Sequence, residues 1–230
     1  MDNFEEKLKK AMVSLSATRP IFHCERDFQH SLASEYVRID PASTVRVEYP
    51  EPRIGTKRRR YVDLLIREAR STCFVELKHY TNSFTKRVDN EDFNLTAQSF
   101  QDVGKFHFLS DIKRIEEFVV HRHCTSGAVI LLTNDSRYWA NLAPGKCDQD
   151  FLLCEDRILH MGAKLKWSTH DSIAEKKNFA REIILKNDYN LSWRDYHDHQ
   201  CKNGCFRYLL VQIPEKVSQF KKLKEVTTLP

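Results

Sequence analysis

Two short apolar runs stand out in the pattern of hydrophobic and polar residues, and they follow each other closely along the chain. Residues 61–66 and 73–78 are rich in aliphatic and β-branched side chains, and the charged segment 67–71 separates them. Two such runs around a short polar turn predict a β-hairpin. With the turn centred between Ala69 and Arg70, Asp63 lies directly opposite Glu76.

Acidic residues occupy positions in this hairpin where the pattern expects apolar ones. Directly opposed side chains lie about 5 Å apart, so Asp63 and Glu76 form a close carboxylate pair. Lys78 points to the same face because side chains alternate along a strand. Like charges this close favour a raised pKa or a bound cation, and oxygen ligands without His or Cys suit Mg²⁺. A lysine beside them matches the parts of metal-assisted phosphodiester hydrolysis.

The alternative interpretation is a hairpin with one solvated face. Against it, Leu64, Leu65, Val75 and Leu77 indicate that both strands are largely buried. Buried charges need partners or metals.

The order Asp63, then Glu76-Leu77-Lys78 on the next strand, resembles the PD-(D/E)XK nuclease superfamily of restriction-endonuclease-like proteins. Val62 stands where that motif has its proline. The resemblance implies a core over residues 20–133, made of a helix, a three-stranded meander, a second helix and a fourth strand. It also implies Mg²⁺ as cofactor, with Mn²⁺ as a substitute.

The remaining pattern predicts the elements that such a core needs. Helical spacing occurs at residues 5–15 and again at Phe28, Leu32 and Tyr36; alternation at 44–49 predicts a strand. The apolar run 127–133 predicts a buried strand, parallel to one already in the sheet because a helix precedes it, and residues 206–213 predict a late strand. We expect an α/β fold with a central mixed sheet flanked by helices. Residues 1–230 form one domain, with 134–230 as a C-terminal extension packed on the core.

The helices on either side of the hairpin supply further candidate residues through the resemblance. The first helix places Glu25 as a third metal-binding carboxylate, with Gln29 one turn later; Asp27 and Glu35 are alternatives. The polar segment 79–90 is expected to be a loop at the mouth of the site. A second helical stripe runs from Leu95 to Val119, with a bend at Gly104, and places Gln98 near the scissile phosphate or, alternatively, in solvent.

Basic residues are in slight excess over the whole chain and cluster in one loop. The chain of 230 residues carries 37 Lys and Arg against 32 Asp and Glu, a net charge of +5 that permits a polyanionic partner without requiring one. The loop before the Asp63 strand is rich in basic residues: Arg53, Lys57, Arg58, Arg59 and Arg60. These side chains either form a solvated face or contact nucleic-acid phosphates.

Cysteine usage and the N-terminal sequence bear on the compartment. Seven cysteines form no regular framework, and no signal peptide or long apolar span is present, so we expect a cytoplasmic protein with reduced thiols and no membrane partner. His197, His199, Cys201 and Cys205 are spaced too compactly for the usual zinc ligand pairs and are expected to be surface histidines with free thiols.

Together these features predict a metal-dependent nuclease with DNA as the leading substrate, RNA remaining open, and a possible homodimer. Asp63, Glu76 and Glu25 hold the metal, and Lys78 and Gln98 act at the phosphate. A second hypothesis is a catalytically inactive protein of the same fold that binds nucleic acid or serves as a scaffold. A third is a small-molecule or protein-interaction domain in which the hairpin acids are coincidental.

Overall fold

The computed structural model describes residues 3–52, 60–141, 148–168 and 182–215. The first half of the chain forms α1 (Phe4–Thr18), α2 (Glu25–Ile39), β1 (Thr44–Pro50), β2 (Tyr61–Arg67), β3 (Thr72–Tyr80), β4 (Phe84–Val88), β5 (Glu91–Leu95), α3 (Gln101–Val120) and β6 (Ser126–Thr133). The second half forms two short 3₁₀ turns, η1 (Ser136–Tyr138) and η2 (Gln149–Phe151), and then β7 (Ile158–Leu159), β8 (Lys164–Leu165), β9 (Ile183–Ile184), β10 (Tyr189–Asn190), β11 (Trp193–Asp198) and β12 (Cys205–Ile213).

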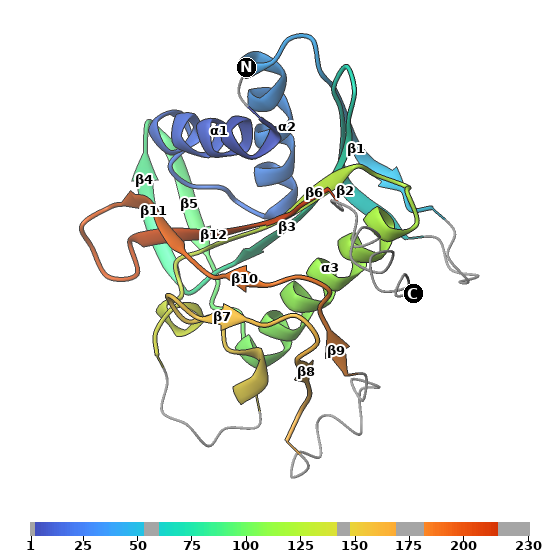
Figure 1. The fold of residues 1–230 in the computed structure, drawn as a ribbon. Coiled ribbons are helices and arrows are strands. Elements are labelled where there is room, and N and C mark those ends of the chain that lie inside the picture. The colour runs from blue at the N-terminus through green and yellow to red at the C-terminus, as the bar shows by residue number, and fades with distance from the viewer. Residues whose placement is uncertain (1–2, 53–59, 142–147, 169–181, 216–230) are drawn as a thin grey trace, which may run out of the picture.

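A six-stranded mixed sheet in the order β1-β2-β3-β6-β12-β11 forms the centre of the fold. Strands β3 and β6 are parallel, and every other neighbouring pair in this sheet is antiparallel. Helices α1 and α2 cover one face and α3 covers the other (Figure 1). The predicted α/β class, with an antiparallel meander and one parallel strand between helices, is therefore confirmed.

Each face of the sheet has its own apolar core because β3 and β6 are buried on both sides. Phe28 and Tyr36 of α2 pack with Val75 on one face. Phe108 and Ile112 of α3 pack with residues of the other face, such as Phe74. All eight residues of β6 are buried, as its continuous apolar run predicts for a central strand.

The hairpin of β2 and β3 has the predicted register. Leu64 pairs with Val75 and Ile66 with Cys73, and the N–H of Glu68 donates to the carbonyl of Ser71 across the turn. The β2–β3 ladder ends at Leu64, whereas β2 stays paired with β1 as far as Tyr61. Strand β2 therefore separates from β3 one position before Asp63 would pair with Glu76, and the edge of β3 beyond Val75 lies open.

The expectation of a loop over residues 79–90 is wrong. Strand β3 continues to Tyr80, and β4 and β5 form a second hairpin. Asp89 and Asn90 adopt positive φ angles of 47° and 67° at its tip, the backbone required by a tight two-residue hairpin turn. Phe84 and Phe93 are buried on one side of it, and the polar residues that suggested a loop form its exposed face.

The start of the second long helix also differs from the prediction. Helix α3 begins at Gln101, so Leu95 ends β5 and Gln98 lies in the connection rather than on the helix. Gly104 lies inside α3 without ending it. A Cβ atom at Gly104 would lie 2.3 Å from the hydroxyl oxygen of Tyr138, so close packing accounts for this glycine.

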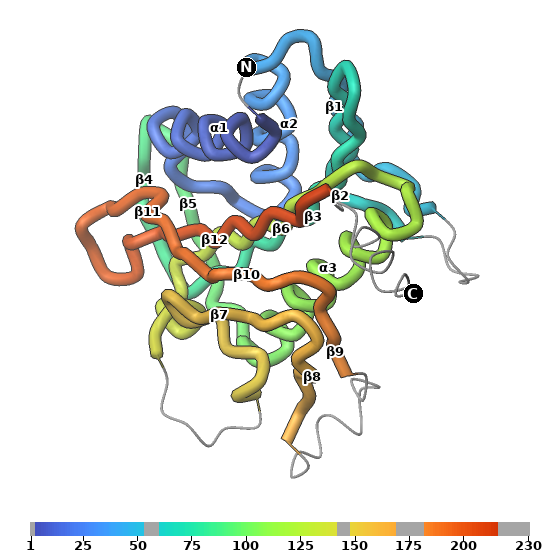
Figure 2. The backbone as a smooth tube through the Cα atoms, viewed as in Figure 1, coloured from blue at the N-terminus to red at the C-terminus, as the bar shows by residue number. Residues whose placement is uncertain are grey.

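The segments after β6 extend the sheet and cover α3. Strand β12 pairs with β6, and β11 pairs with β12 at the edge of the sheet. The short pairs β7–β10 and β8–β9 lie on the α3 side (Figure 2). Buried Glu116 of α3 accepts hydrogen bonds from the N–H of Lys186 and the hydroxyl of Tyr189, which fixes this region to the helix. No helix in the described ranges has the length and apolar character needed to cross a membrane.

Candidate active site

The predicted site residues meet where β2 separates from β3. Without β2 beside it, β3 has N–H groups on alternate residues that need acceptors. The N–H of Leu77 donates to Oδ2 of Asp63 at 2.6 Å, and the N–H of His79 donates to Oε2 of Glu25 at 3.1 Å. The two carboxylates therefore lie in succession along the open edge of β3, in place of the missing strand.

Helix α2 brings Glu25 to this edge. Glu25 is the first residue of the helix, where a carboxylate is favoured by the partial positive charge of the helix N-terminus. One turn later, buried Gln29 donates from Nε2 to the main-chain oxygen of Asp63 at 2.8 Å. Both predicted polar residues of this helix therefore contact the hairpin, and Gln29 fixes the position of Asp63 relative to α2.

Helix α3 contributes two charged residues that the sequence analysis missed. Nζ of Lys78 lies 2.9 Å from Oδ2 of Asp111. Nη2 of Arg114 lies 2.6 Å from Oε2 of Glu76 and 2.9 Å from Oδ1 of Asp111. The signal in the sequence was an Asp and an Arg three positions apart within an otherwise apolar helical face, which indicates a buried pair facing the sheet.

Six charged groups meet here, and their charges do not cancel. We call these six groups the acidic cluster. Its carboxylates are Glu25, Asp63, Glu76 and Asp111, and its cations are Lys78 and Arg114. Four negative and two positive charges leave a net charge of −2 when all six are ionised. Glu76 is only 2% exposed, and its Oε1 has no hydrogen-bond partner among the described residues. With all six groups ionised, the cluster would therefore carry uncompensated negative charge in a poorly solvated place.

Three carboxyl groups of the acidic cluster have raised pKa values. Burial raises the pKa of Asp63, against the opposing effects of the Leu77 N–H and Lys78. Burial and the charge of Asp111 raise the pKa of Glu76 well above its usual value, although Arg114 opposes them. Burial also raises the pKa of Glu25. These carboxyl groups are thus held in surroundings that favour a proton or another positive charge.

Lys78 is kept charged by the same neighbours. Burial alone would lower the pKa of Lys78, but the carboxylates of Asp111, Glu25 and Glu76 outweigh it and raise the pKa above that of an ordinary lysine. An ammonium group with a fixed charge next to carboxylates can bind an anionic oxygen but is a poor proton donor or base at neutral pH.

The donor set of the acidic cluster fits a divalent cation of the Mg²⁺ type. The charge of Asp63 is among the causes that raise the pKa of Glu76, so a proton or a cation between the two carboxylates would relieve their repulsion. Mg²⁺ commonly binds through one or two carboxylates and keeps several waters. Among the residues that the structure describes, no three His, Cys, Asp or Glu side chains form a ready ligand set, so the protein offers a carboxylate pair rather than a closed cage.

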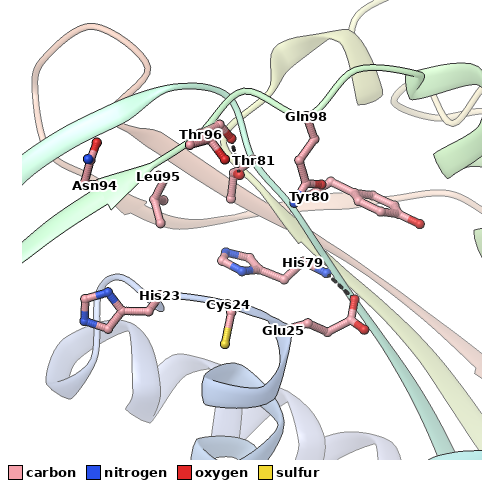
Figure 3. Close-up of a pocket in the computed structure, with 10 residues that line it drawn as sticks. All are labelled: His23, Cys24, Glu25, His79, Tyr80, Thr81, Asn94, Leu95, Thr96 and Gln98. Carbon is pink, nitrogen blue, oxygen red and sulfur yellow. Dashed lines mark hydrogen bonds between the residues drawn. The ribbon is translucent and has the colours of Figure 1, made fainter.

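Gln98 and Glu25 share a pocket beside the acidic cluster. The pocket has a volume of about 260 Å³ and lies between the N-terminus of α2 and the end of β5 (Figure 3). Gln98 is exposed and donates its main-chain N–H to Thr81. The structure thus places Gln98 near the site, from a connecting segment instead of from α3.

The basic loop falls mostly outside the described residues. Arg53, Lys57, Arg58 and Arg59 lie in the segment 53–59, of which nothing is described. Arg60 is exposed immediately before β2, and its carbonyl accepts the N–H of Glu51. The role proposed for this loop in binding phosphates stays a prediction.

The compact His and Cys group near the C-terminus has no metal-holding arrangement in the described part of the chain. Cys201 and Cys205 are exposed free thiols, as expected. His199 is buried rather than exposed, and burial lowers its pKa to about 4. Its ring lies against His197, with ring centroids 4.4 Å apart, and packs beside Phe84 and Phe206.

Comparison of the chain with protein-family models, with curated proteins and with solved structures found no match. A function for this chain is therefore inferred from the geometry and charge of the acidic cluster.

Proposed function

We propose that this protein is a metal-dependent nuclease that hydrolyses phosphodiester bonds, with DNA as the leading substrate. The observation that carries the proposal is the unbalanced charge of the acidic cluster. Buried carboxylates normally come with compensating charge, and here a net charge of −2 and an unpaired Glu76 oxygen match one divalent cation.

Five of the six residues of the acidic cluster have a direct role in this proposal. Asp63 and Glu76 would hold Mg²⁺ or Mn²⁺, which supplies an activated water and charge stabilisation at phosphorus. Lys78 binds a non-bridging phosphate oxygen or orients the attacking water. Asp111 keeps the Lys78 ammonium in place, and Arg114 holds one oxygen of Glu76 so that the other stays available.

The reaction is a displacement at phosphorus. A water molecule gives up a proton to solvent as its oxygen forms a bond to phosphorus, the bond from phosphorus to one ester oxygen breaks, and that oxygen takes up a proton from solvent. Lys78 is kept protonated by its carboxylate neighbours, so it serves as an electrostatic partner of the phosphate. Since the site would contact phosphate, a group that DNA and RNA share, RNA is the alternative substrate.

Arg114 favours a second candidate function. A guanidinium 2.6 Å from Glu76 occupies one carboxylate oxygen, as in a purely structural ion-pair network. A protein with this arrangement could bind nucleic acid or act as a scaffold without turnover. The two candidates differ in their response to metal.

The test is cleavage of single-stranded and double-stranded DNA and RNA with Mg²⁺, Mn²⁺, Ca²⁺ or EDTA. We expect cleavage with Mg²⁺ and Mn²⁺, and binding without cleavage in Ca²⁺. Nucleic-acid binding with no cleavage in any metal would instead support the scaffold, and full cleavage in EDTA would exclude a metal-dependent mechanism.

A further inference from the structure

The pocket next to the acidic cluster has the features of a binding site. One wall comes from His23, Cys24 and Glu25 at the start of α2, and the opposite wall comes from Asn94, Leu95, Thr96 and Gln98 (Figure 3). The imidazole of His79 lies between these walls. His79 is only 4% exposed, and its Nε2 has no hydrogen-bond partner among the described residues.

An unpaired buried imidazole nitrogen costs free energy unless a ligand or a water molecule forms a hydrogen bond with it. Three other residues of the lining also carry hydrogen-bonding groups without a charge. Asn94, Thr96 and Gln98 contribute amides and a hydroxyl from exposed positions. The pocket can thus form hydrogen bonds with the donors and acceptors of a small polar ligand.

The charge of the lining argues against a phosphate as this ligand. The described residues of the lining include no Lys or Arg, and Glu25 adds a carboxylate. A carboxylate repels phosphate but accepts hydrogen bonds from the amino groups of nucleobases. A flat ligand is also favoured, because His23 stacks on Phe93 with centroids 4.4 Å apart while its side chain stays 44% exposed, which leaves an aromatic surface beside the pocket.

The size of the pocket sets the scale of the ligand. A volume of about 260 Å³ lies just below the range of about 300–1,000 Å³ that encloses drug-sized molecules. This volume suits one nucleobase and excludes a base pair with its backbone. Glu25 belongs to both the pocket and the acidic cluster, so a base held here would lie next to the phosphate under attack.

We propose that this pocket binds a single unpaired nucleobase adjacent to the scissile phosphate, an inference that rests on the nuclease function proposed above. Enzymes that take a base out of the stack pay for unpairing and unstacking, and this cost is smallest for single-stranded, mismatched or terminal bases. The pocket therefore predicts a preference for phosphodiester bonds next to an unpaired base over those in continuous duplex.

The test uses oligonucleotides that carry one 2-aminopurine at successive positions, because the fluorescence of this base rises when it leaves the stack. Binding is followed with Ca²⁺ in place of Mg²⁺. The blocking variant is Thr96→Trp, at an exposed position of the lining, and the matched control is Ala97→Trp, at the neighbouring exposed position that does not line the pocket. Polarisation of an end label reports total binding.

We expect 2-aminopurine fluorescence to rise at one position for the wild type and Ala97→Trp. With Thr96→Trp it should not rise, and affinity for single strands should fall about tenfold, the range expected when one base can no longer stack. Binding and Mg²⁺-dependent cleavage without any fluorescence rise would overturn the base pocket and leave the nuclease function intact. An equal rise in both variants would also overturn it. Absence of both binding and cleavage would overturn the two proposals together.

Discussion

The main-chain N–H of Leu77 donates to Oδ2 of Asp63 across 2.6 Å, so a carboxylate of the acidic cluster also completes the open edge of β3. Asp63 therefore has a structural role and a proposed chemical role, and suitable substitutions separate them. Asparagine at this position keeps an acceptor oxygen and removes the charge. Alanine removes both.

We accordingly expect Asp63→Asn to abolish cleavage and change stability little. Asp63→Ala should abolish cleavage and also lower the free energy of unfolding by about 1–3 kcal/mol, because the Leu77 N–H loses its partner. Urea denaturation of both variants measures this difference. If the two variants were equally stable, the hydrogen bond would contribute nothing to the fold and its role at the edge of β3 would have to be given up.

The ion pair between Lys78 and Asp111 predicts a non-additive effect on stability. Their nitrogen and oxygen atoms are 2.9 Å apart, and both side chains are mostly buried. We expect the summed destabilisations of Lys78→Met and Asp111→Asn to differ from that of the double variant by about 0.5–3 kcal/mol, as contacting residues do. A double-mutant cycle in urea gives this coupling, and additive effects would show that the contact is energetically unimportant.

Lys78→Met also separates an active site from a structural one. If Lys78 acts on the phosphate, the variant should lose the chemical step and keep nucleic-acid affinity within about tenfold, or 1.4 kcal/mol. Single-turnover cleavage and equilibrium binding of the same oligonucleotide measure the two effects. A strong loss of stability in a protein whose wild type cleaves nothing would identify Lys78 as a structural partner only.

The raised pKa of Glu76 predicts how the stability of the metal-free protein depends on pH. Burial raises the pKa of Glu76 in the folded state, while an unfolded Glu titrates at about 4.3. The folded state therefore retains a proton that the unfolded state has lost, and stability falls as pH rises from about 4 through the raised pKa. Glu76→Gln cannot lose that proton.

In EDTA, the stability of Glu76→Gln relative to the wild type should therefore increase as pH rises from about 4 to about 8. Urea denaturation at a series of pH values measures the difference. A difference that stays constant with pH would mean that Glu76 is ionised normally, and the argument from unbalanced charge would lose its main support.

The basic loop before β2 carries a separate prediction about binding. Replacing Arg58 and Arg59 with glutamine should weaken binding to unrelated sequences equally, because phosphate contacts carry no base information. The dependence of log affinity on log salt concentration should flatten by about one unit for each arginine that no longer reaches a phosphate. Fluorescence polarisation at several salt concentrations measures this slope, and Arg70→Gln, in the turn between β2 and β3, is the control. An unchanged slope would assign the loop to solvated surface.

The elements with a simple pattern of hydrophobic residues were predictable from the sequence. The register of β2 and β3 followed from two apolar runs and a short charged turn, and β6 followed from an uninterrupted apolar run. The β4–β5 hairpin was not predicted because one of its faces is solvated and Asp89-Asn90 is a weaker turn signal than a sequence with glycine. The start of α3 was misplaced because Leu95 fits both a helical stripe and the strand that precedes it.

The sequence predicted only the part of the candidate site that lies within one hairpin. Asp63, Glu76 and Lys78 lie on one hairpin whose register follows from its sequence, so spacing is enough to predict that they come close together, although β2 leaves β3 just before Asp63. Asp111 and Arg114 reach the same place through packing of α3 across the sheet. A helical pattern identifies the buried face of a helix but not the residues that it meets. The ion pairs that hold Glu76 and Lys78 therefore became visible only in the folded chain.

The most direct test of the account compares two glutamates that are each paired with an arginine. Glu76 pairs with Arg114 inside the acidic cluster, whereas Glu35 pairs with Arg38 on α2 at 2.5 Å, away from the cluster. The measurement is the single-turnover rate of phosphodiester cleavage with Mg²⁺ for the wild type, Glu76→Gln and Glu35→Gln, with thermal melts to confirm folding. We expect cleavage by the wild type and Glu35→Gln and only background cleavage by Glu76→Gln. Equal rates for the two variants, or no cleavage of DNA or RNA by the folded wild type, would contradict it.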